Sequence, residues 1–529
     1  MGRATRDVAW LRLKASWAGV FGRREIWWFR ECECSLPSTL GGGRRSRTAG
    51  LQRKRIAVAD VVIVGAGVVG LGTALLLAED GHAVTVLERD PAPPPNGCDA
   101  AWGAWERRGV NQFRLPHAFL GRYRAIVDAE LPRVAEAVEA AGGLRYNPLL
   151  DIPADLRGPE RPEDREVEIL TGRRPVVEMA VASVAEATPG LRVRRGVGVE
   201  GLITGAQARK GIPHVVGVLT SGGEEVRADL VVDMSGRRSP LPRWLDEAGL
   251  PPLREEIEDS GFMYYGRHYR SADGSVPFTF GPALQPLGTI SSLTLAADNG
   301  TWSVVVISSA KDKALYGLRE VDSFERLFRS LPLVAHWLDG EPLEDRVATI
   351  TKIEDRWRSL LVDGEPIVTG LVAAGDAWAC SNPSVGRGAS IGMLQGVTLR
   401  DTLREAGGED PYTLAGAFHE ATAEVVEPWF MWTRFEDRHR LAEIDTLIAG
   451  ERYEPADRRW ELEQALAAAV TKDPDLLRVA LRAAFVLDPL EEALAAPGVA
   501  ERVLELGADR GQVPVPAPPR AELVAIANS

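Results

Sequence analysis

The sequence predicts an α/β fold made of a Rossmann-like dinucleotide-binding domain, an interleaved α+β domain and a C-terminal helical region. Three observations predict it. Residues 60–90 read as a strand, a glycine-rich turn, a helix and a second strand. Short β-like runs separated by glycine turns occupy much of residues 176–310, and the pattern is mostly helical after Pro411. With 529 residues and 45% apolar content, the chain can bury a large core and form several domains.

Residues 60–90 carry the strongest motif in the chain. A β-branched strand is followed by three glycines at G-x-G-x-x-G spacing, namely Gly65, Gly67 and Gly70. In a dinucleotide cradle these glycines allow, in that order, a tight turn, close approach of the backbone to a pyrophosphate, and packing of the helix on the strand. Residues 84–87 form the second strand. Glu88 follows it, where a carboxylate can accept hydrogen bonds from both ribose hydroxyls of an adenosine.

The alternative for this stretch is a membrane span, because residues 61–78 contain no charged side chain. The four glycines within it and its β-branched opening favour a strand, turn and helix over one continuous helix. We therefore expect no stable membrane insertion.

The charge balance differs between the first 57 residues and the rest of the chain. Residues 1–57 hold 13 of the 62 Lys and Arg residues but only 4 of the 75 Asp and Glu residues. The remainder is strongly acidic, which argues against a nucleic-acid partner or an anionic membrane surface. A basic leader of this kind can be a transit peptide. We prefer a disordered or non-native N-terminal extension, because the first strand begins only near Val58.

The four cysteines, Cys32, Cys34, Cys98 and Cys380, are too few and too scattered for a disulfide framework or a zinc ribbon. They favour a reducing compartment, and we expect a cytoplasmic protein. The seven histidines show no metal-type spacing, so we expect no metal ion.

Short strands are expected after the cradle, over residues 176–181, 191–199, 215–219 and 230–232. A second G-x-G-x-x-G lies among them at Gly196, Gly198 and Gly201. Because strand rather than helix should follow it, no helix N-terminus is available there to hold a phosphate. We therefore expect a single dinucleotide fingerprint. An antiparallel sheet is expected over residues 261–310.

Helices are expected over residues 118–141, 323–338, 413–433, 437–449, 458–470, 475–485 and 490–506. Arg124 lies near the start of the first, where its guanidinium could reach a bound phosphate or ribose; a solvated helix face is the alternative. The proline-rich residues 513–519 should end the fold. No chemistry is evident after Pro411, so the C-terminal helices should cover a substrate cavity or form a dimer contact.

Residues 371–403 form a second informative stretch. A short strand ends at Gly375 and Asp376, which places a carboxylate where it can bind a hydroxyl. Pro383 blocks helix, and the glycines that follow it, Gly386 and Gly388, let the backbone approach a ligand closely. A helix then runs over residues 389–405 and offers its positive N-terminal end to that ligand. Taken alone, the stretch could be an ordinary strand-loop-helix connection.

A third stretch is a buried strand that ends on Asp233 and continues as MSGRRSPLPRWL. Together the three stretches resemble the FAD-dependent monooxygenases of the glutathione-reductase-like fold, a broad group of aromatic hydroxylases, polyketide epoxidases and halogenase-like proteins. The resemblance covers roughly residues 58–403. Two residues separate Asp233 from Gly236, which departs from the hydroxylase form of this segment.

The resemblance implies that FAD is the cofactor. The residues that would bind it are Gly65, Gly67, Gly70, Glu88, Arg89, Arg124, Asp233, Gly375, Asp376, Pro383, Gly386, Arg387 and Gly388. Asp376 would contact the ribityl chain, and the Pro383 loop would lie along the isoalloxazine. In the segment QFRLPH, Arg114 and His117 would lie near the flavin as a proton donor or polar positioner. A core role for His117 is the alternative.

The resemblance also implies a domain order. Residues 1–57 would be the extension, residues 58–250 and 351–410 the FAD-binding Rossmann-like domain of glutathione-reductase type, and residues 251–350 a substrate-binding sheet. Residues 411–529 would be the helical region.

The implied function is an FAD-dependent monooxygenase. It would activate O2 as a flavin C4a-hydroperoxide and hydroxylate or epoxidise a small-to-medium apolar organic substrate, as enzymes of secondary metabolism do. With one fingerprint, NAD(P)H would donate electrons directly and transiently, or a separate flavin reductase would deliver them. We expect a monomer or a homodimer.

Three other functions are consistent with an FAD-binding fold: halogenation, alkene reduction and non-catalytic binding. Halogenation is disfavoured, because flavin halogenases need a lysine after the first cradle and a Trp-x-Trp-x-Ile-Pro motif, and this chain has no lysine between Lys54 and Lys210. A flavin-dependent alkene reductase or dehydrogenase of the geranylgeranyl-reductase type stays open. A non-catalytic FAD-fold carrier is less consistent with the intact Pro383 loop.

Overall fold

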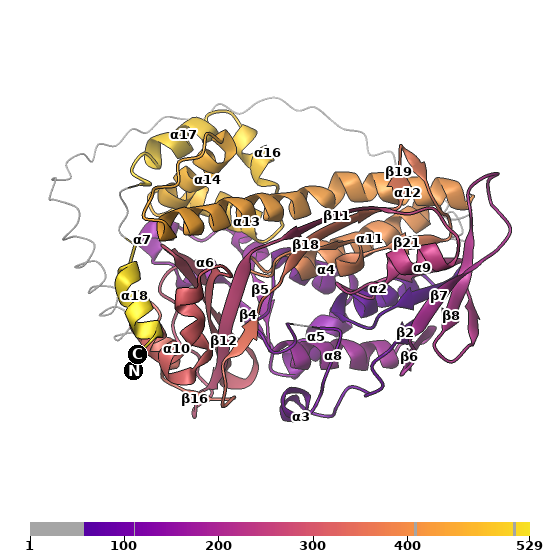
Figure 1. The fold of residues 1–529 in the computed structure, drawn as a ribbon, viewed down its shortest axis with the longest axis horizontal. Coiled ribbons are helices and arrows are strands. Elements are labelled where there is room, and N and C mark those ends of the chain that lie inside the picture. The colour runs from indigo at the N-terminus through magenta and orange to yellow at the C-terminus, as the bar shows by residue number, and fades with distance from the viewer. Residues whose placement is uncertain (1–57, 111, 407–409, 512–514) are drawn as a thin grey trace, which may run out of the picture. The chain divides into compact units, whose positions relative to one another are not determined.

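The computed structural model describes residues 58–110, 112–406, 410–511 and 515–529 (Figure 1). The predicted N-terminal extension lies outside the described residues. A parallel five-stranded sheet in the order β21-β10-β1-β2-β6 carries the cradle. Its strands are β1 (Asp60–Val64), β2 (Ala83–Glu88), β6 (Leu191–Arg195), β10 (Leu230–Asp233) and β21 (Leu371–Ala373). All neighbouring pairs are parallel, so the carboxyl ends of the strands meet at one edge.

Both faces of this sheet are covered, which explains the continuous apolar runs of its strands. Val61 and Ile63 face a core built by α2, α4, α5, α8 and α11. Val62 and Val64 face a second core shared with α9 and the C-terminal helices. The covering helices are α2 (Val68–Glu79), α4 (Gly121–Glu130), α5 (Pro132–Ala140), α8 (Arg174–Glu186), α9 (Leu241–Glu247) and α11 (Gly388–Ala406).

A six-stranded antiparallel sheet in the order β13-β14-β15-β12-β16, with β17 paired to β12, forms the second large layer. Its strands are β12 (Phe262–Arg270), β13 (Leu284–Leu287), β14 (Ile290–Ala296), β15 (Thr301–Ser309), β16 (Glu341–Pro342) and β17 (Ala348–Ile350). Alternate residues face opposite sides, as the strand period of two requires. Tyr265 and Val304 pack toward α10 (Val321–Arg329), whereas Tyr264 and Val305 pack toward the C-terminal helix α13 (Glu427–Ile448).

Smaller elements connect these layers. Three-stranded sheets are formed by β3 (Ala118–Phe119), β5 (Ile169–Thr171) and β4 (Leu144–Tyr146); by β7 (Val199–Thr204), β8 (Val215–Thr220) and β9 (Glu225–Arg227); and by β11 (Arg254–Asp259), β18 (Glu354–Ser359) and β22 (Ala379–Cys380). A two-stranded hairpin pairs β19 (Leu361–Val362) with β20 (Glu365–Pro366). Short helical turns include α3 (Cys98–Gly103), α6 (Pro148–Asp151), α7 (Ala154–Arg157), η1 (Pro162–Val167), η3 (Lys313–Arg319) and η5 (Gly375–Ala377).

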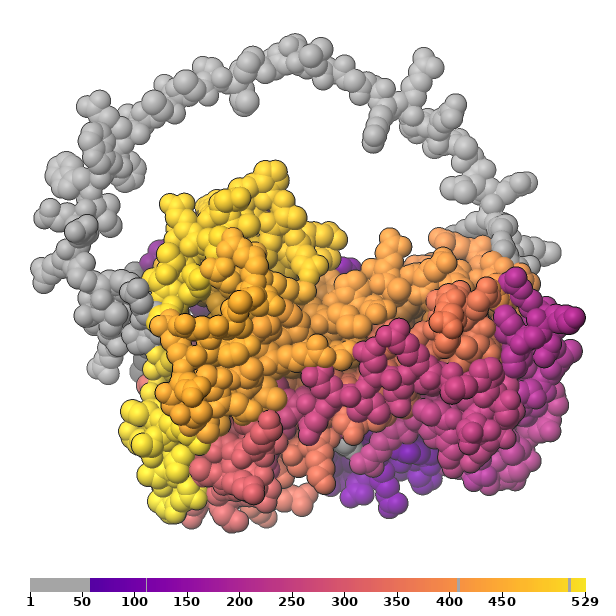
Figure 2. All heavy atoms as spheres, turned by 45° about the horizontal axis from the view of Figure 1, so that its top comes forward, coloured from indigo at the N-terminus to yellow at the C-terminus, as the bar shows by residue number. Residues whose placement is uncertain are grey.

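The C-terminal region is helical, as predicted. Figure 2 shows its residues, in orange and yellow, over a large part of one face of the molecule. Its helices are α12 (Pro411–Val425), α13 (Glu427–Ile448), α14 (Arg458–Ala469), α15 (Pro474–Ala484), α16 (Leu490–Ala495), α17 (Val499–Leu506) and α18 (Arg520–Ala527). The proline-rich segment does not end the fold. The chain continues into α18, whose Leu523 and Ala527 are buried in the core beneath the antiparallel sheet.

Prolines explain most of the errors in the predicted helices. The helix predicted over 118–141 begins as strand β3 and divides into α4 and α5 at Pro132. The helix predicted over 323–338 ends at Arg329, before Pro332, and resumes only as the turn η4 (Ala335–Leu338). A proline removes a backbone donor and clashes with the preceding turn, so it begins helices more readily than it continues them.

Two further predictions of helix length are wrong for the same reason. The 413–433 helix divides near Pro428 into α12 and α13, and α13 then runs unbroken to Ile448 through the predicted gap at 434–436. The 490–506 helix divides at the Pro497-Gly498 pair into α16 and α17.

The strand predicted over 176–181 is wrong, because these residues lie inside helix α8. All six are buried. A short apolar run cannot distinguish a buried strand from a helix segment that is covered on every side. The second G-x-G-x-x-G behaves as predicted: strand β7 begins within it at Val199 and includes Gly201, so no helix begins there. No helix among the described residues is long and apolar enough to cross a membrane. The predicted domain boundaries stay predictions.

Candidate functional site

The glycine turn after β1 has the geometry that its spacing predicts. Gly65 has φ +111°, and a Cβ there would collide with the carbonyl oxygen of Met234. A Cβ on Gly70 would collide with the carbonyl oxygen of Gly65, so this glycine lets α2 pack against the turn. A Cβ on Gly67 would have no atom within 4 Å. Gly67 therefore leaves open space at the N-terminus of α2, where a pyrophosphate would lie.

Glu88 lies at the end of β2, beside this turn, and its side chain is buried. Its Oε2 accepts hydrogen bonds from the backbone N of Ala66 at 2.9 Å and from Arg107 Nη2 at 2.7 Å, and its Oε1 accepts from the backbone N of Asp90 at 2.9 Å. Three of its roughly four acceptor positions are thus in use. Contact with a ribose stays a prediction. Arg89, the next residue, is exposed.

Arg107 is a site residue to which the sequence pattern assigned no role. Its buried guanidinium binds Glu88, Asp90 (3.2 Å) and Glu178 (2.8 Å), and Nη1 also donates to the carbonyl oxygen of Ala66 at 3.1 Å. The other oxygen of Glu178 accepts from Arg174 Nε at 2.7 Å. Glu178 and Arg174 were missed because their helix, α8, was predicted as strand.

Asp376 follows β21 at the same edge of the sheet, in the turn η5. The backbone N of the preceding Gly375 donates to Gln395 Oε1 of α11 at 2.8 Å. The carboxylate of Asp376 accepts no hydrogen bond from any described residue. Burial raises its pKa, and the positive charges of Arg174 and Arg237 partly oppose that rise. Asp376 is therefore an available acceptor close to two guanidinium groups.

The two predicted motifs meet because α2 and α11 cross at three glycines. A Cβ on Gly72 would lie 2.5 Å from Met393 Sδ, and one on Gly392 would lie 2.8 Å from Val69 Cγ1. A Cβ on Gly396 would collide with the side chain of Thr73. The spacing Gly392-x-x-x-Gly396, which lets two helices approach closely, is the sequence signal for this crossing. Close packing here brings the starts of both helices to the same edge of the parallel sheet.

The loop between β22 and α11, residues 381–387, contains the remaining predicted residues of this motif. Gly386 has φ +69°, which favours glycine, and a Cβ on Gly388, the first residue of α11, would meet no atom within 4 Å. Pro383 lines a cavity beside the loop. Arg387 instead lies against α13, with its guanidinium carbon 3.6 Å from the centre of the Trp432 ring.

Two predicted cofactor-binding residues have other partners. Asp233 is fully buried at the end of β10, where its carboxylate accepts from the backbone N of Ser235 at 3.0 Å and from the hydroxyl of Ser239. Burial raises its pKa. Arg124 donates to Asp128 at 2.9 Å and to the carbonyl oxygen of Glu166 at 3.0 Å. Their contacts with FAD stay predictions.

The two candidate catalytic residues lie in different electrostatic surroundings, and neither lines the cavity beside Pro383. His117 Nδ1 is 3.0 Å from the carbonyl oxygen of Leu115. Burial lowers the pKa of His117 to about 3, with a further contribution from Arg174. The ring is therefore neutral at physiological pH, and donation from Nδ1 leaves Nε2 as an acceptor. Arg114 donates to the carbonyl oxygen of Trp105 at 2.9 Å, while its buried Nη1 has no hydrogen-bond partner among the described residues.

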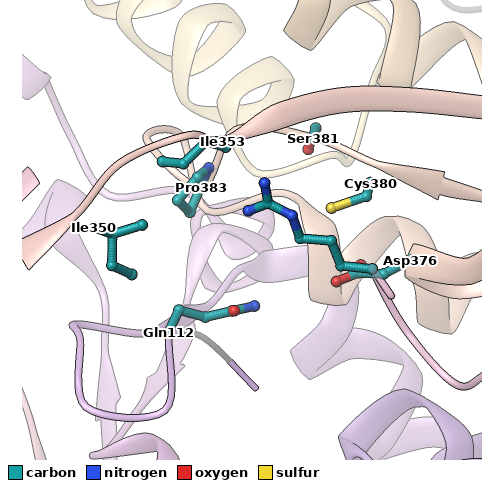
Figure 3. A pocket seen from close by; sticks show the side chains of 8 residues that line it. Gln112, Ile350, Ile353, Asp376, Cys380, Ser381 and Pro383 are labelled. Carbon is teal, nitrogen blue, oxygen red and sulfur yellow. The ribbon is translucent and has the colours of Figure 1, made fainter. Parts of the chain in front are cut away.

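A cavity opens beside Asp376 (Figure 3). Its lining residues are Gln112, Arg237, Ile350, Ile353, Asp376, Cys380, Ser381 and Pro383. Ile350 belongs to β17 of the antiparallel layer and Ile353, just before β18, packs in the same core as Tyr264 of that layer, whereas Asp376 follows the parallel sheet. The cavity therefore lies between the two layers and combines apolar walls with a carboxylate and a guanidinium. Among the described residues, no three His, Cys, Asp or Glu side chains gather as a metal site would require.

Comparison with known proteins agrees with this geometry. Residues 60–235 match the sequence profile of the family described as FAD dependent oxidoreductase. The flavin-dependent brominase Bmp2 superposes with a TM-score of 0.55 at 17% identity, over 86% of this chain and 100% of its own. The chain has the fold of the FAD-dependent oxidoreductases. The predicted fold class and the resemblance to FAD-dependent oxidoreductases are confirmed.

Two further similarities each cover most of this chain. OxyS, the anhydrotetracycline hydroxylase from Streptomyces rimosus, superposes with a TM-score of 0.50 at 20% identity, over 81% of this chain and 76% of its own. Protein Rv3254 from Mycobacterium tuberculosis is 28% identical over 457 residues, which are 81% of this chain and 90% of that protein. The identities to the two solved structures establish the fold alone.

The residues present fit FAD. Gly67 and Gly388 leave open space in front of two helix N-termini, and Asp376 offers an acceptor that no described residue uses. The fold brings most of the predicted motif residues to the carboxyl edge of the parallel sheet or to the cavity beside it. They are Gly65, Gly67, Gly70, Gly375, Asp376, Pro383 and Gly388.

Proposed function

We propose that this chain binds FAD and acts as a monooxygenase that hydroxylates or epoxidises a small-to-medium apolar organic substrate. The observation that supports this most is the cavity between the two layers. Asp376 provides a polar group on one side, while Ile350, Ile353 and Pro383 provide apolar walls on the other. Binding sites for small molecules commonly combine an apolar cavity with a few convergent polar groups.

The chain's own residues would bind and orient FAD. The open N-termini of α2 and α11 would direct backbone amides and partial positive charge at the pyrophosphate and the flavin ring, respectively. Asp376 would accept from hydroxyls of the ribityl chain, and Arg174 would place a positive charge beside it. When bound and reduced, FAD supplies the reaction with O2.

The remaining residues would prepare the substrate side. Ile350 and Ile353 would exclude water from the reacting atoms, which suppresses wasteful loss of the oxidant. His117 is neutral, so its Nε2 would accept a hydrogen bond from a polar group of the substrate. Electrons would come from NAD(P)H, directly or through a flavin reductase. Although Bmp2 shares the fold, the absence of lysine between Lys54 and Lys210 argues against halogenation.

Reconstitution followed by oxygen labelling tests this function. Purified protein should bind FAD, with the visible absorption of a bound flavin, and should consume O2 when NADH, NADPH or a flavin reductase supplies electrons. With an apolar aromatic or polyene substrate panel under 18O2, one labelled oxygen atom should enter the product. A product without label, formed by saturation of an alkene, would replace this proposal with the reductase function. Failure to bind FAD would overturn both.

A further inference from the structure

Helix α13 lies directly against residues 381–387, the loop that precedes α11. Three of its residues contact one side chain of the loop: Arg387 packs over the Trp432 ring, donates to Thr433 Oγ1 at 3.4 Å and forms an ion pair with Glu436. Arg387 is only 3% exposed. Glu436 of α13 therefore neutralises the charge of Arg387, and the Arg387 side chain does not line the cavity.

Asp437, the next residue of α13, holds the other end of the loop. Its Oδ1 accepts from Asn382 Nδ2 at 2.9 Å and from Ser384 Oγ at 3.3 Å. These two residues flank Pro383, which lines the cavity. One carboxyl oxygen thus binds the loop on both sides of the proline that would face the flavin.

Asn382 is bound on every side. Its backbone N donates to Asp355 Oδ1 of β18 at 2.7 Å, its Oδ1 accepts from the Tyr264 hydroxyl, and its second amide hydrogen points to Ser384 Oγ at 3.2 Å. Asn382 is 1% exposed. These hydrogen bonds hold the Asn382 side chain in one conformation, because any displacement leaves one of its buried donors or acceptors unpaired.

Asp437 itself is only 5% exposed, and its Oδ2 has no hydrogen-bond partner among the described residues. A buried carboxylate with one oxygen unpaired is unfavourable, and protonation would remove the cost of burying its charge. Burial and the neighbouring Asp355 both raise the pKa of Asp437, in agreement with a neutral side chain.

We propose that Asp437 is a positioning residue for the flavin: as a hydrogen-bond acceptor on α13, it holds Asn382 and Ser384 so that Pro383 and the start of α11 meet the isoalloxazine. This inference rests on the proposed binding of FAD. It gives the C-terminal helices, which showed no chemistry in the sequence, a direct part in the cofactor site.

The test compares three variants of the full chain by FAD titration, visible circular dichroism of the bound flavin, and thermal unfolding without FAD. Asp437→Ser is too short to reach Asn382, so its FAD dissociation constant should rise about tenfold, as expected for the loss of a buried hydrogen bond, and the flavin dichroism should change. Asp437→Asn keeps the acceptor without a charge and should restore both to within about threefold of wild type. Asp445→Ser, on the same helix but bonded to Ser309 of the sheet, is the matched control and should change neither.

The outcomes separate this inference from the proposed function. The wild-type dissociation constant reports whether FAD binds at all, and a protein that does not bind it overturns both. If FAD binds but Asp437→Ser keeps wild-type affinity and dichroism, only the inference fails. It also fails if Asp445→Ser has the same effect as Asp437→Ser, or if Asp437→Asn is as weak as the serine variant. If Asp437→Ser unfolds more easily, the dichroism of its FAD-loaded, folded fraction still decides.

Discussion

At the scale of single residues, Arg174 links the two ends of the candidate cofactor site. Through Nε it binds Glu178, which binds Arg107, which in turn binds Glu88 beside the first glycine turn. Its terminal nitrogens have no hydrogen bond to any described residue, although the charge affects the pKa values of both Asp376 and His117. A guanidinium whose Nε is hydrogen-bonded while its two terminal nitrogens have no partner among the described residues is suited to bind an oxygen-rich ligand.

Replacement of Arg174 by Gln should weaken FAD binding. Loss of one charge-assisted hydrogen bond is worth about 1.5–3 kcal/mol, so the dissociation constant should rise roughly tenfold to a hundredfold. Fluorescence titration of FAD would measure it. Arg124→Gln is the control, because Arg124 is bonded to Asp128 and to backbone carbonyls. If the Arg124 variant loses affinity and the Arg174 variant does not, the cofactor contact belongs to Arg124.

Two glycines of the first motif should separate folding from binding. Gly67→Ala adds a methyl group in open space, so thermal stability without FAD should stay near wild type while FAD affinity falls at least about tenfold, since the methyl occupies ligand space. Gly70→Ala forces a collision with the Gly65 carbonyl and should lower the free energy of unfolding by about 1–3 kcal/mol even without FAD. Equal losses of stability in the two variants would contradict the assigned roles.

At the scale of elements, α13 connects the cofactor loop to the antiparallel sheet. Its middle holds residues 381–387, and three residues further on Arg440 donates to the carbonyl oxygens of Gly288 and Ile290, both at 2.8 Å. Near its end Ile444 is buried against the same sheet. One helix thus contacts both the cofactor loop and the antiparallel sheet, and the loop is clamped between it and β18 through Asp355.

The clamp should make stability depend on pH through Asp355. Burial and the charge of Glu258 raise its pKa from 3.8 to about 6, against the opposing charges of Arg434 and Arg438 and its hydrogen bond from Asn382. The folded state therefore binds this proton more tightly than the unfolded chain, so the contribution is fully present below about pH 4 and is lost as pH rises through about 6. The shift corresponds to about 3 kcal/mol.

Asp355→Asn keeps the acceptor for Asn382 and removes the titration. Relative to wild type, the variant should therefore gain about 3 kcal/mol of unfolding free energy as pH rises from 4 to 7. Denaturant unfolding at several pH values measures this difference. Parallel pH curves for the two proteins would show that Asp355 does not titrate as its surroundings indicate.

At the scale of the whole molecule, the C-terminus returns to the antiparallel layer. Leu523 of α18 is 1% exposed in the core under that sheet, and Arg520 forms two hydrogen bonds with Asp312, at 2.7 and 2.9 Å. The last helix is therefore part of the core on the face of the sheet opposite α13 (Figure 1). It closes a core that the preceding elements leave open.

Leu523→Ala should lower the free energy of unfolding by about 2–5 kcal/mol, the usual range for removal of a buried leucine side chain. Val515→Ala, at an exposed position shortly before α18, should change it by less than about 0.5 kcal/mol. Thermal or denaturant unfolding compares the two. A leucine variant as stable as the valine variant would mean that α18 contributes little to the core.

By itself the sequence determined the local features: where strands end, which glycines turn, and which carboxylates follow the strands. The structural roles of Gly65 and Gly70 and the position of Asp376 could be predicted because each depends on spacing along one strand-turn-helix unit. Helix lengths were less certain, since Pro132 and Pro428 begin new helices where apolar periodicity alone suggested continuity.

Only the tertiary structure decided which distant side chains meet. Val176–Val181 reads equally well as strand or helix, and packing on every side selects helix α8, which brings Arg174 and Glu178 to the cofactor edge. Asp437 lies 53 residues after Ser384, yet they bond because α13 crosses the loop. This contact depends on how α13 packs across the loop, and no local spacing in the chain encodes that arrangement.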